Sequence, residues 1–134
     1  MPQLIDVHIK QVRSVLELAV PVWHSNLTQH DKNNIERVQK CALAAILGDS
    51  YHSYDYALKV TNLKTLEDRR QQLCLNFAKK VESNHKHNWF KETSKGRVTR
   101  LKPEKYCDVH ARTVRFEKSP ISYLTQLLNS YHKQ

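Results

Sequence analysis

The stretch from Thr28 to Gly48 carries both end signals and the apolar stripe of one long helix. Its first residues, "TQHD", have the form of a capping box, in which the Thr28 hydroxyl accepts from first-turn amides while the Asp31 carboxylate reaches back. Gly48 suits the left-handed position that commonly ends a helix. Between these ends apolar residues recur at three- and four-residue steps, at Ile35, Val38, Ala42, Leu43, Ile46 and Leu47. The pattern predicts a helix with this stripe in the core.

The N-terminal stretch predicts another helix, over about Asp6–Val20, that stops at a proline. Pro21 cannot continue a helix without losing a backbone donor and clashing with the preceding turn, so we expect the chain to turn near it. The apolar run "VLELAVPVW", residues 15–23, has nine residues and includes a glutamate, whereas a membrane helix needs roughly 20 apolar residues. We therefore expect this run to pack in a core, with no membrane span. Its helical stripe is Val12, Val15, Leu16 and Ala19.

Three further helices begin at hydroxyl residues that suit the N-cap position. Ser53 precedes a short helix through Leu58, and "TLED", starting at Thr65, opens a third long helix with a second capping-box form. Ser119 followed by Pro120 marks the start of a C-terminal helix. On the third helix we expect apolar residues inward, namely Leu66, Leu73, Phe77 and Val81, and cations outward, namely Arg69, Arg70, Lys79 and Lys80.

Glycine and proline are scarce, with two and four among 134 residues, which argues against an all-β fold with many tight turns. Together with the helix signals, this predicts an all-α protein of one domain, a small bundle of three main helices plus the C-terminal helix. We expect residues 1–82 to form the bundle, residues 83–118 a basic loop, and residues 119–134 a helix packed on the bundle. The strand candidate is "TVRF", Thr113–Phe116, which alternates weakly.

The net charge of +9 is concentrated in residues 83–118, hereafter the basic segment. This segment has ten Lys and Arg against four Asp and Glu, whereas residues 1–82 have 11 against nine. Such a concentration is the usual mark of a polyanion partner, nucleic acid first and an acidic membrane second; the alternative is a solvated surface. Five of its cations recur at short steps, at Lys95, Arg97, Arg100, Lys102 and Lys105.

Aromatic residues interleave with these cations, at Trp89, Phe90, Tyr106 and Phe116. Aromatic rings beside phosphate-neutralising cations are typical of proteins that bind unpaired bases. The alternative is that the rings anchor the basic segment to the helical core.

The sequence contains no glycine-rich phosphate loop, nucleophile elbow or HExxH motif. We therefore expect no enzyme activity and no cofactor. His85, His87, Cys107 and His110 offer four ligands of the kind zinc takes, but their spacing matches no standard finger, so the zinc interpretation stays open. Three widely separated cysteines without a secretion signal indicate reduced thiols inside a cell, in the nucleus or the cytoplasm.

Four stretches follow one another along almost the whole chain: "KQVRSVLELAVPVWHSNLT" at 10–28, "IERVQKCALAAILG" at 35–48, "YALKVTNLKTLEDRRQQLCLNFAKK" at 56–80 and "RTVRFEKSPISYLTQLLN" at 112–129. In order and spacing they resemble the C-terminal part of the polyprotein of non-LTR (LINE-type) retrotransposons. The resembling region lies just after the reverse-transcriptase palm, where the thumb is. In that family the Val-Pro-Val-Trp stretch ends one thumb helix and turns into the next.

The resemblance implies an all-α thumb that holds a template-primer duplex, with a basic tail that helps to bind nucleic acid. It makes Arg37, Lys40, Arg69 and Arg70 candidate contacts to the nucleic-acid backbone. Arg112 and Arg115 match an "RTxRF" element, for which the resemblance assigns no role.

The departures from the family decide what kind of activity to expect. The family's polymerase chemistry uses palm aspartates that hold two metal ions, and this chain has no adjacent aspartate pair, no nuclease domain and no complete zinc knuckle. We therefore expect a remnant that binds RNA or an RNA/DNA duplex without catalysis. The alternative is a protein-interaction module, which would expose an apolar stripe around Trp23, Leu43 and Ile46.

Overall fold

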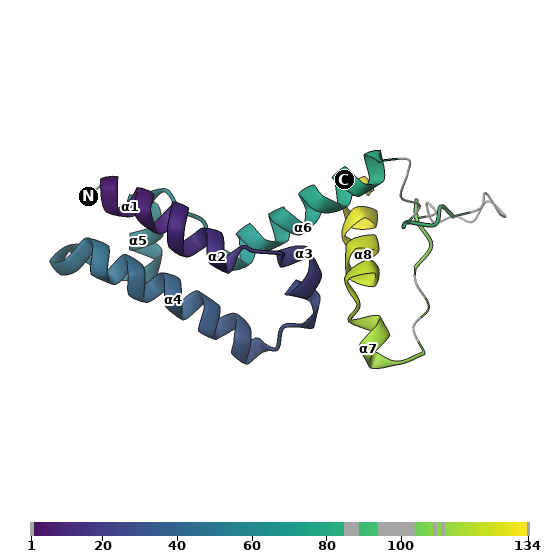
Figure 1. Cartoon of the computed structure of the whole chain (residues 1–134), viewed down its shortest axis with the longest axis horizontal. Coiled ribbons are helices and arrows are strands. Elements are labelled where there is room, and N and C mark those ends of the chain that lie inside the picture. The colour runs from purple at the N-terminus through teal and green to yellow at the C-terminus, as the bar shows by residue number, and fades with distance from the viewer. Residues whose placement is uncertain (1, 85–88, 94–103, 109, 111, 134) are drawn as a thin grey trace. The chain divides into compact units, whose positions relative to one another are not determined.

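The computed structural model describes residues 2–84, 89–93, 104–108, 110 and 112–133, and their secondary structure is helical apart from one isolated antiparallel bridge (Figure 1). The prediction of an all-α protein built as a small bundle is confirmed. In chain order the elements are α1 (Pro2–Val7), the π-helical η1 (His8–Arg13), α2 (Ser14–Leu16), α3 (Val20–Trp23), η2 (His24–Asn26), α4 (Gln29–Leu47), η3 (Gly48–Ser50), α5 (Tyr54–Thr61), α6 (Leu66–Ser83), α7 (Val114–Glu117) and α8 (Pro120–His132).

The predicted helix starts are confirmed by their hydrogen bonds. The Thr28 hydroxyl accepts from the Asp31 amide at 3.2 Å, and the Asp31 carboxylate accepts from the Thr28 amide at 3.2 Å, so α4 begins with a complete capping box. Gly48 follows α4 with a φ of 52°, a backbone conformation that glycine adopts without steric cost. Side-chain oxygens also cap the starts of α5, α6 and α8, at Ser53, Thr65 and Ser119.

The first helix differs from its prediction at both ends. It begins at Pro2 rather than Asp6, and α2 ends at Leu16, before a turn in which Ala19 has a φ of 52°. Pro21 therefore lies in the first turn of α3 and does not terminate the preceding helix. The first turn tolerates proline because its missing backbone donor would have no partner there in any case.

The inner face of α4 also differs from the predicted stripe. Val38 is 43% exposed, whereas Gln39 is completely buried in line with Leu43 and Leu47. The Gln39 amide donates to the Tyr54 hydroxyl at 2.9 Å and to the Lys64 carbonyl oxygen at 3.2 Å. These bonds satisfy the two donors of the Gln39 amide, whereas its side-chain oxygen has no hydrogen-bond partner among the described residues. The satisfied donors lower the cost of burying a residue that hydropathy alone would place on the surface.

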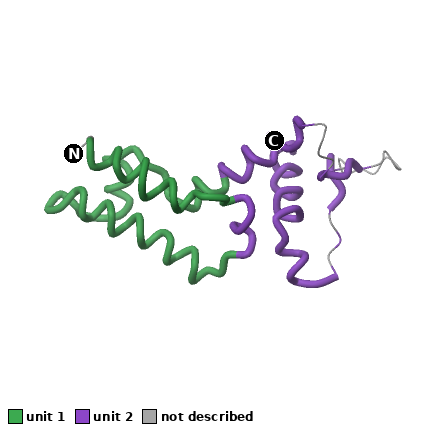
Figure 2. The backbone as a smooth tube through the Cα atoms, viewed as in Figure 1, with its two compact units in different colours: residues 1–20, 27–71 green, residues 21–26, 72–134 purple. Residues whose placement is uncertain are grey.

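The backbone divides into two compact units, which Figure 2 colours separately. Unit 1 comprises residues 1–20 and 27–71, and unit 2 comprises residues 21–26 and 72–134. This division differs from the expected grouping of residues 1–82, because it assigns most of α6 to unit 2. The apolar core of unit 1 is formed by Leu43, Leu47 and Ala57, with Tyr51, Tyr54, Leu58 and Leu63 packed against it.

Unit 2 buries side chains from α6, α8 and two described stretches of the basic segment, namely Cys74, Ala78, Val81, Phe90, Tyr106, Leu124 and Leu128. The strand prediction for Thr113–Phe116 is wrong. Thr113 instead caps α7, its hydroxyl accepting from the Phe116 amide at 3.3 Å, so a local cap stabilises one helical turn where no strand partner is present among the described residues. Among the described helices, none is long and apolar enough to cross a bilayer.

Candidate nucleic-acid interface

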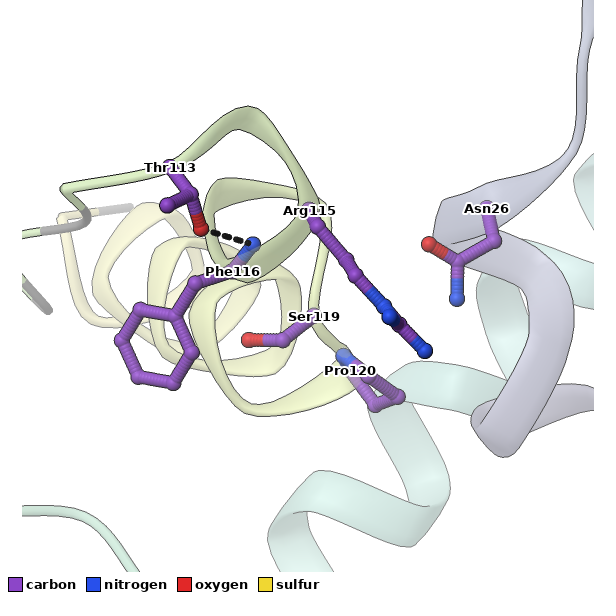
Figure 3. Close-up of a pocket in the computed structure, with 6 residues that line it drawn as sticks. All are labelled: Asn26, Thr113, Arg115, Phe116, Ser119 and Pro120. Carbon is purple, nitrogen blue, oxygen red and sulfur yellow. Dashed lines mark hydrogen bonds between the residues drawn. The ribbon is translucent and has the colours of Figure 1, made fainter.

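A cavity of about 560 Å³ lies in unit 2 where α7 turns into α8, hereafter the α7–α8 pocket. Its size falls in the range of roughly 300–1,000 Å³ typical of small-molecule sites. Figure 3 shows its lining, which combines one cation, one aromatic ring, two hydroxyls, one amide and one proline. The lining residues are Asn26, Thr113, Arg115, Phe116, Ser119 and Pro120.

The pocket is shaped by a tight reversal of the chain between two capped helices. After the single turn of α7, the Lys118 amide donates to the Val114 carbonyl oxygen at 3.1 Å, and the Ser119 amide to that of Phe116 at 3.0 Å. Ser119 then caps α8, and Pro120 is suited to the first helical position because it has no donor to lose.

Asn26 reaches the same pocket from a distant part of the sequence. It ends η2, which contacts α8, and the ring of His24 in η2 lies 5.3 Å from the ring of Tyr123 in α8, measured between centroids. Nothing in the sequence around Asn26 marks it as a site residue, because its place depends on this long-range contact.

Arg115 and Phe116 leave the same turn in different directions. In Figure 3 the Arg115 side chain extends toward Asn26 and Pro120, whereas the Phe116 ring lies on the other side of Ser119. Phe116 is 47% exposed, and Arg115 is also exposed. No described acidic side chain forms an ion pair with Arg115. Its guanidinium thus retains its donors for a ligand.

Two of the predicted cations are engaged by carboxylates of the protein itself. The Lys105 ammonium lies 2.6 Å from the Glu82 carboxylate, and the Arg69 guanidinium lies 3.1 Å from that of Glu17. Each ion pair has little net charge with which to attract a phosphate, so neither residue is a strong candidate contact to nucleic acid.

Arg70 contradicts its predicted outward position. It is 1% exposed, and its three guanidinium nitrogens have no hydrogen-bond partner within the described residues. The reason is helical register, because Leu66, Arg70, Cys74 and Ala78 form the buried line of α6 at four-residue steps. A side chain in this position is not a surface contact for nucleic acid.

The remaining predicted cations fall into three groups. Arg37 and Lys40 are exposed on α4 in unit 1, where the Lys40 ammonium lies 5.0 Å from the centroid of the Tyr54 ring. Arg112 is exposed in unit 2, three residues before Arg115. The other four, Lys95, Arg97, Arg100 and Lys102, lie outside the described residues.

Two described stretches within the basic segment, residues 89–93 and 104–108, are joined to each other. Glu92 and Tyr106 form the antiparallel bridge, and around it the Thr93 amide donates to the Lys105 carbonyl oxygen at 3.0 Å and the Cys107 amide to that of Lys91 at 2.8 Å. Asn129 of α8 holds the bridge, since its side chain bonds both the amide and the carbonyl oxygen of Tyr106 at 3.0 Å.

Glu82 is the electrostatic centre of this junction. Burial alone would raise the pKa of its carboxyl, but hydrogen bonds from Lys105, Tyr106 and His132 outweigh burial and lower the pKa from 4.5 to about 2. The carboxylate is thus held in its ionised form by three donors. Sequence reasoning missed Glu82, whose partners are 23 to 50 positions away along the chain.

The zinc interpretation gains no support from the residues that the structure describes. The Cys107 sulfur lies 3.7 Å from both the Glu92 carbonyl oxygen and the Thr93 hydroxyl, and no group of three metal-binding side chains is found within the described ranges. His85 and His87 lie outside them.

Comparisons with protein-family models, with curated proteins and with solved structures give no match to this chain.

Proposed function

We propose that this chain binds nucleic acid through contacts to the phosphate backbone, as a thumb-like remnant of a non-LTR retrotransposon reverse transcriptase. The observation that carries the proposal is the exposed Arg115 guanidinium, which lines the α7–α8 pocket beside the exposed ring of Phe116. Guanidinium groups bind phosphate through paired donors, and aromatic rings stack on bases.

The distribution of charge supports this proposal. The chain carries a net charge of +9, and the excess lies in the same basic segment that ends at α7. Arg112 adds a second exposed cation three residues before Arg115. A positive field of this size attracts a polyanion at long range and increases its association rate. The proposal assigns binding to these residues and no catalytic step.

A salt series tests the proposal with the whole chain. If about six phosphates are contacted, the affinity for a labelled RNA/DNA duplex should fall roughly a thousandfold between 50 and 200 mM salt. The double variant Arg112→Gln/Arg115→Gln should bind more weakly and with a shallower salt slope. Its matched control is Lys59→Gln/Lys64→Gln, which removes the same charge from exposed positions in unit 1.

Two outcomes would contradict the proposal. The first is an affinity that does not change with salt. The second is an equal loss of affinity in the double variant and its control, because net charge alone would then account for the binding.

A second candidate function is that of a protein-interaction module. The exposed apolar surface that favours it differs from the surface predicted from the sequence. The stripe around Trp23, Leu43 and Ile46 is not exposed as a unit, because Leu43 is completely buried. The N-terminal helical segment instead exposes Leu4, Val7, Val15 and Leu18 at 53%, 48%, 72% and 74%. Light scattering of the wild type and of Val15→Ser tests this surface. Self-association that is weakened by the substitution would favour it over nucleic-acid binding.

A further inference from the structure

We infer that the α7–α8 pocket takes one unpaired nucleotide, with the Phe116 ring on its base and the Arg115 guanidinium on its phosphate. This inference rests on the proposed nucleic-acid function and specifies its ligand as a single strand, a strand end or a gap. A duplex would then contact the Arg115 guanidinium through its phosphate backbone without placing a base on the Phe116 ring.

The order of Arg115, Ser119 and Phe116 across the pocket matches the order of phosphate, sugar and base in a nucleotide. In Figure 3 the Arg115 side chain and the Phe116 ring lie on opposite sides of Ser119. The base and the phosphate of a nucleotide are likewise separated by its sugar. A sugar placed over the Ser119 hydroxyl therefore puts the base toward the ring and the phosphate toward the guanidinium.

The polar side chains that line the pocket can hydrogen-bond such a ligand while they keep the hydrogen bonds that stabilise the turn. The hydroxyls of Thr113 and Ser119 accept from the amides of Phe116 and Ser122 as helix caps. A hydroxyl that accepts one hydrogen bond still has its own proton to donate. The Asn26 amide adds both donors and an acceptor to the pocket wall.

The exposure of Phe116 argues for an unpaired base over a paired one. Its ring is 47% exposed on a four-residue helix, although burial would stabilise an apolar ring. Inside a duplex both faces of each base are covered by neighbouring bases, so a side-chain ring stacks on bases that are splayed out of the stack. Stacking of this kind tolerates every base, because each has a π-face.

A second cavity among the described residues has a buried cation in its wall but lacks this character. It has a volume of about 180 Å³, lies in unit 1 and contains Arg70 and Lys32 in its wall. The acids Glu36 and Glu67 lie in the same wall, and Lys32 pairs with Glu67 at 3.6 Å. Cations and carboxylates are therefore balanced there, whereas the lining of the α7–α8 pocket contains Arg115 and no acid.

The test measures binding of the whole chain to labelled oligouridine and oligothymidine of about ten nucleotides, a common site length, and to a duplex of the same length at one salt concentration. Phe116→Leu removes the ring but keeps an apolar side chain, and Phe116→Tyr keeps the ring. Val114→Ala, at an exposed position of α7 that does not line the pocket, is the control for local damage.

We expect Phe116→Leu to weaken single-strand binding about tenfold, within the range that loss of one base stack gives. Duplex binding should change less than twofold, and Phe116→Tyr and Val114→Ala should bind like the wild type. Arg115→Gln should weaken binding to all three ligands. The ring and the guanidinium recognise features that RNA and DNA share. Comparing the affinities for oligouridine and oligothymidine therefore shows which of the two supplies the nucleotide.

The failures of the two proposals are distinguishable. If the wild type binds none of the three ligands at low salt, the proposed function itself fails. If the wild type binds nucleic acid but Phe116→Leu leaves single-strand affinity unchanged, or weakens duplex binding equally, the proposed function stands and this inference is overturned.

Discussion

The hydroxyl of Tyr106 donates a hydrogen bond to the Glu82 carboxylate, with 2.5 Å between the two oxygens. Lys105 and His132 contact the same carboxylate at 2.6 and 2.9 Å. One carboxylate of α6 thus binds both residues 105–106 of the basic segment and the last turn of α8, so its ionisation is coupled to the stability of unit 2.

Glu82→Gln should destabilise the chain most at neutral pH and progressively less as the pH falls toward 2. The pKa of Glu82 is lowered from 4.5 to about 2 in the folded state, so its contribution is fully present above pH 4.5 and is lost as the pH falls toward 2. The shift corresponds to roughly 3 kcal/mol at pH 7. Urea unfolding of wild type and variant at pH 7 and pH 3 checks this, with the exposed Glu117→Gln as control. A difference that does not shrink in acid would contradict the linkage.

Lys105→Gln should lower stability but leave the salt dependence of nucleic-acid binding unchanged. The Lys105 charge is already matched by Glu82, whereas Arg115 has no acidic partner among the described residues. Each lost phosphate contact should reduce the salt slope by about 1. We therefore expect that reduction in Arg115→Gln and not in Lys105→Gln, when both are titrated with the same duplex. Equal slopes in the two variants would remove the basis for choosing Arg115.

Arg70→Met should stabilise the chain. A buried charged group whose donors have no hydrogen-bond partner is unfavourable, so its replacement by an apolar side chain of similar length should be stabilising. Arg70 is 1% exposed, and its guanidinium has no hydrogen-bond partner in the described part of the chain. Chemical denaturation should show the gain, and nucleic-acid affinity should stay unchanged. Marked destabilisation would mean that the guanidinium is solvated or paired in solution.

Thr28→Ala should cost about 1 kcal/mol of stability, the usual effect of losing an N-cap. It should also raise the pKa of Asp31, since the hydrogen bonds from Thr28 lower that pKa in the wild type. Denaturation measures the first effect and an NMR titration of the Asp31 carboxyl measures the second. Ser130→Ala, which removes an exposed hydroxyl within α8, should change stability by less than about 0.5 kcal/mol.

The predictions from sequence succeed where the signal is local. Caps at Thr28 and Ser119 depend on residues three positions away, so a short stretch contains both partners. The same range explains the error at Thr113–Phe116, because a hydroxyl cap outweighs weak alternation over four residues.

The predictions fail where burial is decided by distant partners. Gln39 is buried where the Tyr54 hydroxyl and the Lys64 carbonyl oxygen accept hydrogen bonds from its amide nitrogen. Lys105 is neutralised by a carboxylate 23 positions earlier, and Asn26 reaches the α7–α8 pocket through a contact between η2 and α8. Residue type and spacing contain none of this information, so a pattern of cations marks a basic segment without showing which of its charges are available.

The bridge between Glu92 and Tyr106 has a consequence for how this chain tolerates change. The pairing of residues 91–93 with residues 105–107 is held by a few contacts, above all those of Asn129 and Glu82 with Tyr106. These contacts need the Tyr106 hydroxyl and the Asn129 amide together, so substitutions at Tyr106 and Asn129 should be rare in descendants of this sequence.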